Sequence, residues 1–353
     1  PFKDYEKRVA DLTNREFDRK GLSEVLMKMN QQWDAPASTQ NNISRLQEES
    51  STVVIGGQQA GLLTGPLYTI NKVISIIQFA KQQEEKLNRP VIPVFWIAGE
   101  DHDFEEINHV YLPSAKQMKK FKLDTAWNNK QPVSDLSFNA ELCRQWIDEL
   151  FENLEETNYT KELYDHLVST VNQSESYTAF FARLLFDLFA DEGVVLIDSA
   201  HKEVRRLESD YFIQLIEKQS EISEGVFRSL EELKNQGYAV SLEADPNDGH
   251  LFYHYHGERI LLIRDEEGNW RGKQGECLLS NEELLQIAKD QPELLSNNVA
   301  TRPLMQELLF PTLAFIGGPG EIAYWAALHR AFSAIGIKMP PVMPRLSITY
   351  VDR

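Results

Sequence analysis

The chain has 353 residues, a length that predicts two domains or one core with large insertions, and its hydrophobic content of 42% is enough for a globular core. Its 54 acidic residues outnumber its 36 basic residues and give a net charge of −18, which excludes nucleic acid as a main partner because phosphate binding needs clustered cations. The absence of any apolar stretch of about 18 residues argues against a membrane-spanning helix, and two cysteines exclude a disulfide scaffold and fit a reducing cytosol.

The first part of the chain predicts a strand–helix–strand unit. Residues 3–30 look helical and polar, and residues 34–44 look like a loop. Residues 52–55 are a β-branched run that predicts a buried strand, Pro66 opens a predicted helix that runs to about residue 87, and residues 91–98 predict a second strand. Elements in this order imply a parallel sheet.

The middle of the chain is mainly helical in pattern. Residues 116–178 are polar and show no strong strand, and residues 179–191 predict an apolar helix. A third buried strand is predicted at residues 194–198, and one long charged helix follows over about residues 202–235.

The last part returns to strands. Residues 238–279 alternate between short apolar runs and turns, which predicts an antiparallel meander. A capping box then predicts a helix over residues 281–290. Residues 312–316 predict a fourth buried strand, which ends in glycines and leads into a helix, and residues 342–351 predict a fifth strand.

These elements predict an α/β fold: a doubly wound parallel sheet of the Rossmann type, interrupted by insertions. We expect four parts: an N-terminal helical segment (residues 1–50), a discontinuous core (residues 51–115, 179–236 and 297–353), a helical insertion (residues 116–178) and a small β-rich insertion (residues 237–296). Because the chain starts at Pro1 and stops within an apparent strand, we expect it to be a segment of a longer polypeptide.

Ligands of open α/β sheets bind beyond the carboxyl ends of the strands, so the residues after each predicted strand are candidates. Residues 56–66 follow the first strand and hold four glycines, which allow the backbone to approach a ligand closely. The helix that follows offers free N–H groups to an anion. The candidates here are Gly57, Gln58, Gln59, Thr64 and Gly65. The spacing matches neither a dinucleotide fingerprint nor a P-loop, and the alternative is a tight turn formed for packing.

The second strand ends in an acidic segment, residues 99–106, with candidates Asp101, His102 and Asp103. So many carboxylates after a buried strand are costly unless a metal, an amine or a basic side chain neutralises them. The carboxylates beside His102 favour its protonated form or orient it as a base. The alternative is a solvated turn that leads into a helix whose N-terminus accepts acidic residues.

Two later segments supply the remaining candidates. Arg302 could pair with a substrate carboxylate, and the alternative is a structural salt bridge to one of the many acids. Gly317 and Gly318 end the fourth strand, and Glu321 follows them at the expected mouth of the crevice.

Metal and nucleophile signatures are weak. The sequence has no HExxH motif, no cysteine cluster and no GxSxG elbow, and we predict no metal site. Residues 100–103 resemble metal-dependent hydrolase motifs only loosely.

Several of these segments together resemble the cysteine-adding ligase (BshC) family of bacillithiol biosynthesis, most closely the enzyme of bacilli. They are residues 56–68, 93–104 and 311–325, with Arg302-Pro303. The resemblance implies that cysteine is added to glucosaminyl-malate. It also implies a Rossmann-type core with connecting-peptide insertions like those of class I aminoacyl-tRNA synthetases, and a C-terminal coiled coil, absent from this chain, that forms a homodimer.

If the synthetase analogy holds, residues 58–65 occupy the place of the HIGH signature and residues 344–347, with Arg345, fall near that of KMSKS. The first segment has no histidine and the second has no lysine. ATP or another nucleotide is the implied co-substrate, because an amide forms from a free carboxylate only after activation.

The resulting hypothesis is a cytoplasmic ligase that acts on small molecules. The glycine-rich segment forms an anion or nucleotide pocket, and the acidic segment holds an ammonium group or acts as a base. Arg302 or Arg345 pairs with the malate carboxylates, and Gly317, Gly318 and Glu321 form the opposite wall. Two other functions stay open at this point: a non-catalytic nucleotide- or metabolite-binding scaffold, and a metal-dependent hydrolase.

Overall fold

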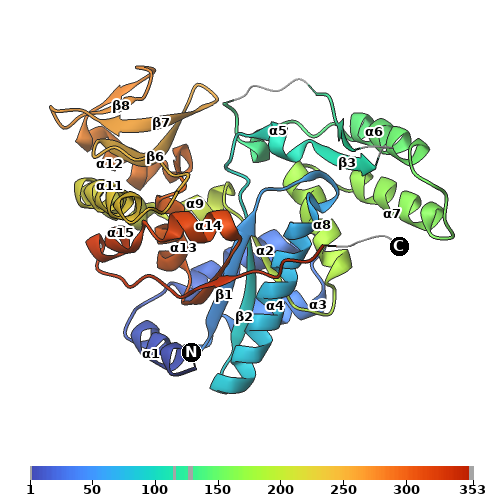
Figure 1. Cartoon of the computed structure of the whole chain (residues 1–353), viewed down its shortest axis with the longest axis horizontal. Coiled ribbons are helices and arrows are strands. Elements are labelled where there is room, and N and C mark those ends of the chain that lie inside the picture. The colour runs from blue at the N-terminus through green and yellow to red at the C-terminus, as the bar shows by residue number, and fades with distance from the viewer. Residues whose placement is uncertain (1, 114–116, 126–129, 350–353) are drawn as a thin grey trace.

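The computed structural model describes residues 2–113, 117–125 and 130–349, and its core is a parallel sheet of five strands in the order β12-β11-β1-β2-β5 (Figure 1). β1 pairs with β2 without a break, from Thr52 opposite Val91 to Gln58 opposite Ile97. The strand bounds are Thr52–Gln58 (β1), Val91–Ile97 (β2), Val195–Asp198 (β5), Thr312–Gly317 (β11) and Val342–Pro344 (β12). The predicted α/β fold with a parallel Rossmann-like sheet is confirmed.

Helices cover this sheet, which explains why its strands are continuously apolar rather than alternating. α4 (Leu67–Leu87) packs on β1 and β2, and its bounds agree with the predicted helix. α2 (Arg19–Gln32) and α3 (Ala37–Arg45) pack on β5, and α1 (Phe2–Thr13) packs on β11. None of the helices in the described ranges is both long enough and apolar enough to cross a membrane.

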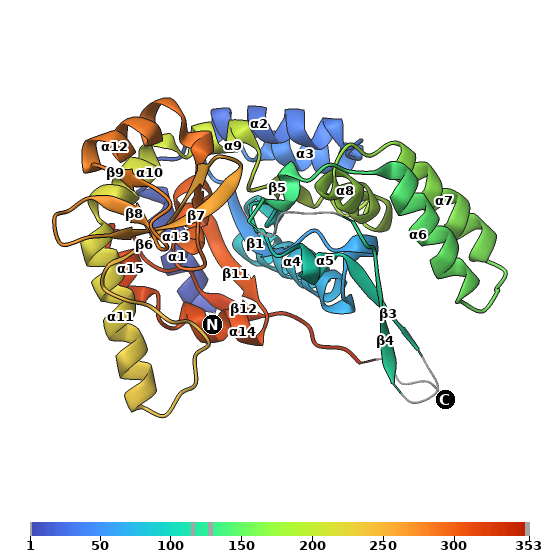
Figure 2. The same cartoon turned by 90° about the horizontal axis from the view of Figure 1, so that it is seen from above.

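The helical insertion has a hydrophobic core of its own. Its helices are α6 (Ala140–Glu152) and α7 (Thr160–Asn172), and it borders α8 (Tyr177–Leu188), which packs in both hydrophobic cores. Tyr177 of α8 packs edge-on against Phe104 from the short helix α5 (Phe104–Ile107). Figures 1 and 2 show this insertion on one side of the core and the β-rich insertion on the other.

A hairpin that the sequence did not predict leads into the helical insertion. β3 (His109–Pro113) pairs antiparallel with β4 (Met118–Lys122), although residues 116–178 show no strong strand pattern. Residue 116 lies outside the described residues. The pattern fails because β4 is mostly exposed and lysine-rich. Within it, Phe121 packs inward and stacks on Trp146, with ring centroids 5.7 Å apart.

The β-rich insertion is an antiparallel sheet in the order β10-β6-β7-β8-β9, so the predicted meander is confirmed. It starts at residue 248, later than predicted. Its strands are Asp248–Tyr255 (β6), Glu258–Arg264 (β7), Trp270–Gly272 (β8), Leu278–Leu279 (β9) and Leu295–Asn297 (β10). α12 (Asn281–Asp290) has the predicted capping box between Ser280 and Glu283.

Three other expectations were wrong in detail. The predicted loop at residues 34–44 contains α3, because its polar side chains bond to the core: Thr39 Oγ1 donates to the carbonyl of Val194. The fifth strand, predicted at residues 342–351, is short, since β12 pairs with β11 over three residues and residues 345–349 are not in a strand; residues 350 and 351 lie outside the described residues.

The long charged helix predicted at residues 202–235 is three helices, α9 (Lys202–Leu207), α10 (Ser209–Glu217) and α11 (Gln219–Asn235). The chain bends at Glu208 and Lys218, which lets α10 pack on α12 and α11 on α15 (His329–Ala334). The remaining helices are α13 (Thr301–Leu309) and α14 (Pro319–Trp325).

Candidate functional site

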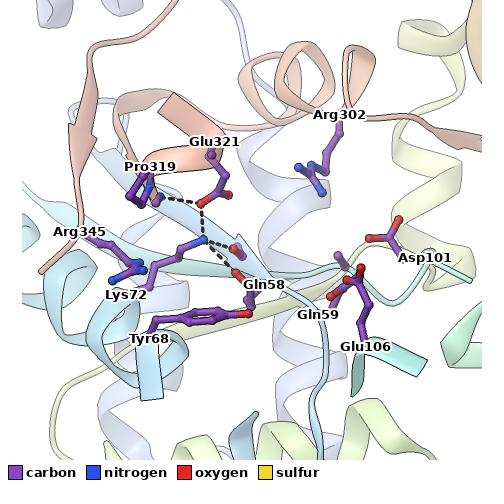
Figure 3. A pocket seen from close by; sticks show the side chains of 14 residues that line it. Gln58, Gln59, Tyr68, Lys72, Asp101, Glu106, Arg302, Pro319, Glu321 and Arg345 are labelled. Carbon is purple, nitrogen blue, oxygen red and sulfur yellow. Dashed lines mark hydrogen bonds and ion pairs between the residues drawn. The ribbon is translucent and has the colours of Figure 1, made fainter. Parts of the chain in front are cut away.

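A cavity of about 370 Å³ lies at the carboxyl ends of β1, β2 and β11 (Figure 3). The chain passes from β1 to β2 in one direction across the sheet, whereas β11 and β12 lie on the other side of β1. This reversal is the switch point at which open α/β sheets bind ligands.

Most of the residues predicted from the strand ends line this cavity: Gly57, Gln58, Gln59, Asp101, Arg302, Gly318, Glu321 and Arg345. Thr64, Gly65, His102, Asp103 and Gly317 do not line it. Thr64 and Gly65 belong to a tight turn with positive φ, which folds so closely that a Cβ on Gly61 would lie 2.6 Å from the Cα of Gly65. The structure therefore brings the four strand-end segments together and sets five of their residues back from the cavity.

Glycine is required at position 57 because β1 and β2 pack closely there. A Cβ on Gly57 would lie 2.5 Å from the carbonyl oxygen of Trp96 on β2, so a side chain larger than hydrogen does not fit. This position lets the backbone of β1 reach the cavity beside β2.

Lys72 on α4 is a central residue of the cavity that the sequence analysis missed. Its side chain is 1% exposed, and its Nζ donates to the carbonyl of Gly57 at 2.6 Å, to Gln58 Oε1 at 3.1 Å and to Glu321 Oε2 at 2.5 Å. Burial lowers the pKa of Lys72, although the charge of Glu321 opposes this. Lys72 thus joins the first and the fourth strand-end segments, as the dashed lines in Figure 3 show.

Two guanidinium groups face the same cavity. Arg302 donates to the hydroxyl of Tyr324 at 2.8 Å, and in the described ranges no other acceptor lies within hydrogen-bond distance of it. Burial lowers the pKa of Arg302, but Tyr324 and nearby carboxylates outweigh that effect and raise it. Arg345 lies over the ring of Tyr68, with 5.2 Å between the guanidinium carbon and the ring centroid. Both guanidinium groups are therefore held in place and have further N–H donors that can bind a ligand.

The acidic segment, residues 99–106, is paired with arginine side chains. A basic side chain was one of the three positive partners expected for it, beside a metal and an amine. Glu100 is buried and accepts from Arg205, and it also accepts from the backbone N–H of Asn297 at 3.3 Å. Burial raises the pKa of Glu100, but the charges of Arg205 and Arg259 more than offset this and lower it. Asp101 lies 3.6 Å from Arg259, and burial raises its pKa against the charge of that arginine.

Arg259 is the second residue that sequence reasoning missed. It belongs to β7 of the β-rich insertion, its side chain is 3% exposed, and its guanidinium carbon lies 3.7 Å from the ring centroid of Phe252. It donates to Asn297 O at 2.7 Å and to Ser296 Oγ at 3.1 Å. Neither Lys72 nor Arg259 stands in a motif; the only local signal is that each is a basic residue within an otherwise buried stretch.

A larger cavity, of about 780 Å³, lies beyond the carboxyl end of β5. Asp198 lines it and accepts from the Ala200 backbone N–H and from Ser134 Oγ, each at 2.9 Å. Burial raises the pKa of Asp198 to about 6, against those hydrogen bonds. Within the residues that the structure describes, no group of three or more His, Cys, Asp or Glu side chains is arranged to hold a metal ion.

Comparison with known proteins identifies the family. The family model described as "Bacillithiol biosynthesis BshC, N-terminal Rossmann-like domain" matches residues 2–346. The chain belongs to this family. The resemblance seen in the strand-end motifs is therefore confirmed, and so is the Rossmann-like core of the family.

Curated relatives carry the name "Putative cysteine ligase BshC". The protein of Oceanobacillus iheyensis is 48% identical over 352 residues, and those of Bacillus cereus strain Q1 and Bacillus thuringiensis strain Al Hakam are each 46% identical over 349 residues. The alignments cover 99% of this chain and 65% of each relative, so the chain spans slightly less than two thirds of their length.

Proposed function

We propose that this chain forms the substrate-binding core of a carbon–nitrogen ligase that adds cysteine to glucosaminyl-malate in the last step of bacillithiol biosynthesis. The names of the BshC relatives and the family description support this reaction. The observation that carries the proposal is the cavity at the switch point, where two guanidinium groups and the partly buried carboxylate of Asp101 line one space.

The charges of the cavity complement such a substrate. Arg302 and Arg345 are suited to pair with the two malate carboxylates, because a guanidinium binds a carboxylate through two parallel hydrogen bonds. Asp101 is suited to the glucosamine amine, since a carboxylate both holds an ammonium group and accepts its proton. Burial raises the pKa of Asp101, which makes it a better proton acceptor near neutral pH.

The amide bond requires an activated cysteine carboxylate. The ammonium group first loses one proton to solvent, and the neutral amine nitrogen then attacks the activated carbonyl carbon. The C–N bond forms, the activating group leaves with its oxygen, and the nitrogen gives one further proton to the carboxylate of Asp101. ATP or another nucleotide supplies this activation in our proposal. The backbone at Gly57, the amides of Gln58 and Gln59, and the N-terminus of α4 would hold its phosphates.

The proposal extends to the surroundings of the enzyme. We expect a cytoplasmic protein, since Cys143 and Cys277 are both free, as thiols are in a reducing compartment. The strong negative charge favours small-molecule substrates over nucleic acid and gives no reason to expect a membrane partner. The family resemblance adds a homodimer formed through a coiled coil.

Reconstitution tests the function. The full-length protein is incubated with cysteine, glucosaminyl-malate and ATP, and bacillithiol and released phosphate or pyrophosphate are measured by mass spectrometry. We expect Arg302→Gln to raise KM for glucosaminyl-malate by about tenfold to a hundredfold, because a charge-assisted hydrogen bond is worth about 1.5–3 kcal/mol. Arg330→Gln is the control, since Arg330 pairs with Glu232 on the surface.

The outcomes separate the candidate functions. Nucleotide binding without any bacillithiol, under conditions where the substrates are shown to be intact, would refute the ligase and favour a binding scaffold. Equal effects of the Arg302 and Arg330 substitutions would refute the assignment of the cavity.

A further inference from the structure

Arg259 links the β-rich insertion to the acidic segment of the core through His102. Its NH1 lies 3.2 Å from His102 Nδ1, and the same nitrogen lies 3.6 Å from Asp101 Oδ1. The guanidinium is held on its other side by Asn297 and Ser296, and it is stacked on Phe252. Its orientation toward His102 is therefore fixed by these three contacts.

The chemistry of the two groups assigns the proton of the imidazole. A guanidinium has only N–H donors, so His102 Nδ1 must be the acceptor of this hydrogen bond. In a neutral imidazole, one nitrogen accepts and the other carries the proton. The proton of His102 therefore sits on Nε2.

The charged form of His102 is disfavoured by the same contact. An imidazolium would turn an N–H at Nδ1 toward the N–H of Arg259 and place two cations together. Burial lowers the pKa of His102, and Arg259 lowers it further, whereas Asp103 and Asp101 oppose the shift. The imidazole ring also packs edge-on against Phe252, with 6.1 Å between the ring centroids. Phe252 carries no charge that would stabilise the imidazolium.

The Nε2 side of the ring remains available to a ligand. Among the residues that the structure describes, the nearest carboxylate oxygen is Asp103 Oδ1 at 3.9 Å, which is too far for a hydrogen bond, and the side chain of His102 is 30% exposed. A nitrogen that already carries a proton cannot accept another, so this side offers a donor and not a base.

We propose that Arg259 is a positioning residue that holds His102 as its Nε2–H tautomer. Asp101 lines the cavity and is the proton acceptor of the site, whereas His102 lies outside the cavity lining and is a neutral hydrogen-bond donor to an oxygen of the part of the substrate that extends past Asp101. The tautomer part stands independently of the reaction. The catalytic part rests on the proposed ligase function.

Nitrogen NMR of the protein labelled with ¹⁵N-histidine tests the tautomer directly, with His102→Gln to assign the signal. At neutral pH we expect a pyridine-like shift at Nδ1 and a pyrrole-like shift at Nε2. The reverse pattern, or pyrrole-like shifts at both nitrogens, would overturn the inference.

Variants of Arg259 test its role. Arg259→Met should mix the two tautomers and raise the pKa of His102, because it removes the donor and the neighbouring charge. Arg264→Met is the matched control, since Arg264 lies on the same strand and faces Trp270 instead. An unchanged tautomer and pKa in Arg259→Met would contradict a positioning role. If that variant does not fold, Arg259→Lys, which keeps one donor and the charge, should retain the wild-type pattern.

Kinetics test the catalytic part. Gln keeps an N–H donor near the position of Nε2 but cannot act as a base, so His102→Gln should recover most of the kcat that His102→Ala loses. Asp101→Asn should lower kcat by about a hundredfold or more, as expected for loss of a proton acceptor. A loss in His102→Gln as large as in His102→Ala would overturn the donor role. If the wild-type protein makes no bacillithiol, the ligase proposal fails and the NMR result still decides the tautomer.

Discussion

Replacing Lys72 by methionine removes a buried cation from three acceptors while keeping a side chain of similar length. The ammonium joins Gly57, Gln58 and Glu321, and its side chain is 1% exposed. Breaking one partner of a buried ion pair costs about 3–5 kcal/mol. The side chain of Glu321 is 20% exposed, so water partly screens it, and we expect the lower end, about 3 kcal/mol.

A double-mutant cycle separates the ion pair from the other contacts. Glu321→Gln keeps an acceptor for the Gly318 N–H, which donates at 2.7 Å in the native protein, and removes only the charge. The Lys72→Met/Glu321→Gln protein should be more stable than the sum of the single effects predicts, with a coupling energy of about 1–2 kcal/mol. Urea unfolding followed by tryptophan fluorescence measures each free energy.

The control lies on the same helix. Lys81 pairs with Glu192 at the surface and is 53% exposed, so Lys81→Met should cost less than about 1 kcal/mol. If Lys72→Met costs no more than Lys81→Met, or if the coupling energy is below about 0.5 kcal/mol, then Lys72 does not hold the two strand-end segments together and the argument fails.

Three further predictions concern other parts of the molecule. The pKa of Asp198 is about 6 in the folded protein and near 3.8 in the unfolded protein, so the folded state holds its proton more tightly. The free energy of unfolding should therefore fall by about 3 kcal/mol as pH rises from about 4 to about 6. Asp198→Asn should remove that fall, as measured by urea titrations at several pH values. Gly57→Ala should lower the unfolding free energy by about 2 kcal/mol or more in the same assay, whereas Gly320→Ala, which meets no atom within 4 Å, should change it little. In the native protein an alkylating reagent should modify Cys277 and spare Cys143, whose burial raises the pKa of its thiol to about 12; mass spectrometry showing modified Cys143 first would contradict the burial.

The strand ends were predictable from the sequence because parallel strands end at one edge of a sheet. A run such as Val53-Val54-Ile55 is apolar since both faces of β1 are covered, and the two glycines after it mark where the backbone must pass close to β11 and β2. These local signals were enough to place Gln58, Asp101 and Arg302 around one cavity.

The side chains that fix the site could not be predicted in this way. Arg259 is 157 residues from His102 in sequence, and Lys72 is 249 residues from Glu321. Such contacts depend on how an insertion or a helix packs against the core, and no local pattern encodes them. The same applies to α3, whose polar sequence resembles a loop until its contacts with Val194 are known.

The order of strands in the sheet has a consequence for synthesis of the protein on the ribosome. β1 lies between β2 and β11, yet β1 ends at Gln58 and β11 begins at Thr312. At about 5–20 residues per second, the roughly 250 residues between them take about 13–50 s to be made. During that time one edge of the apolar strand β1 has no partner, and unpaired apolar edges recruit other chains. The nascent protein should therefore depend on chaperones until β11 emerges.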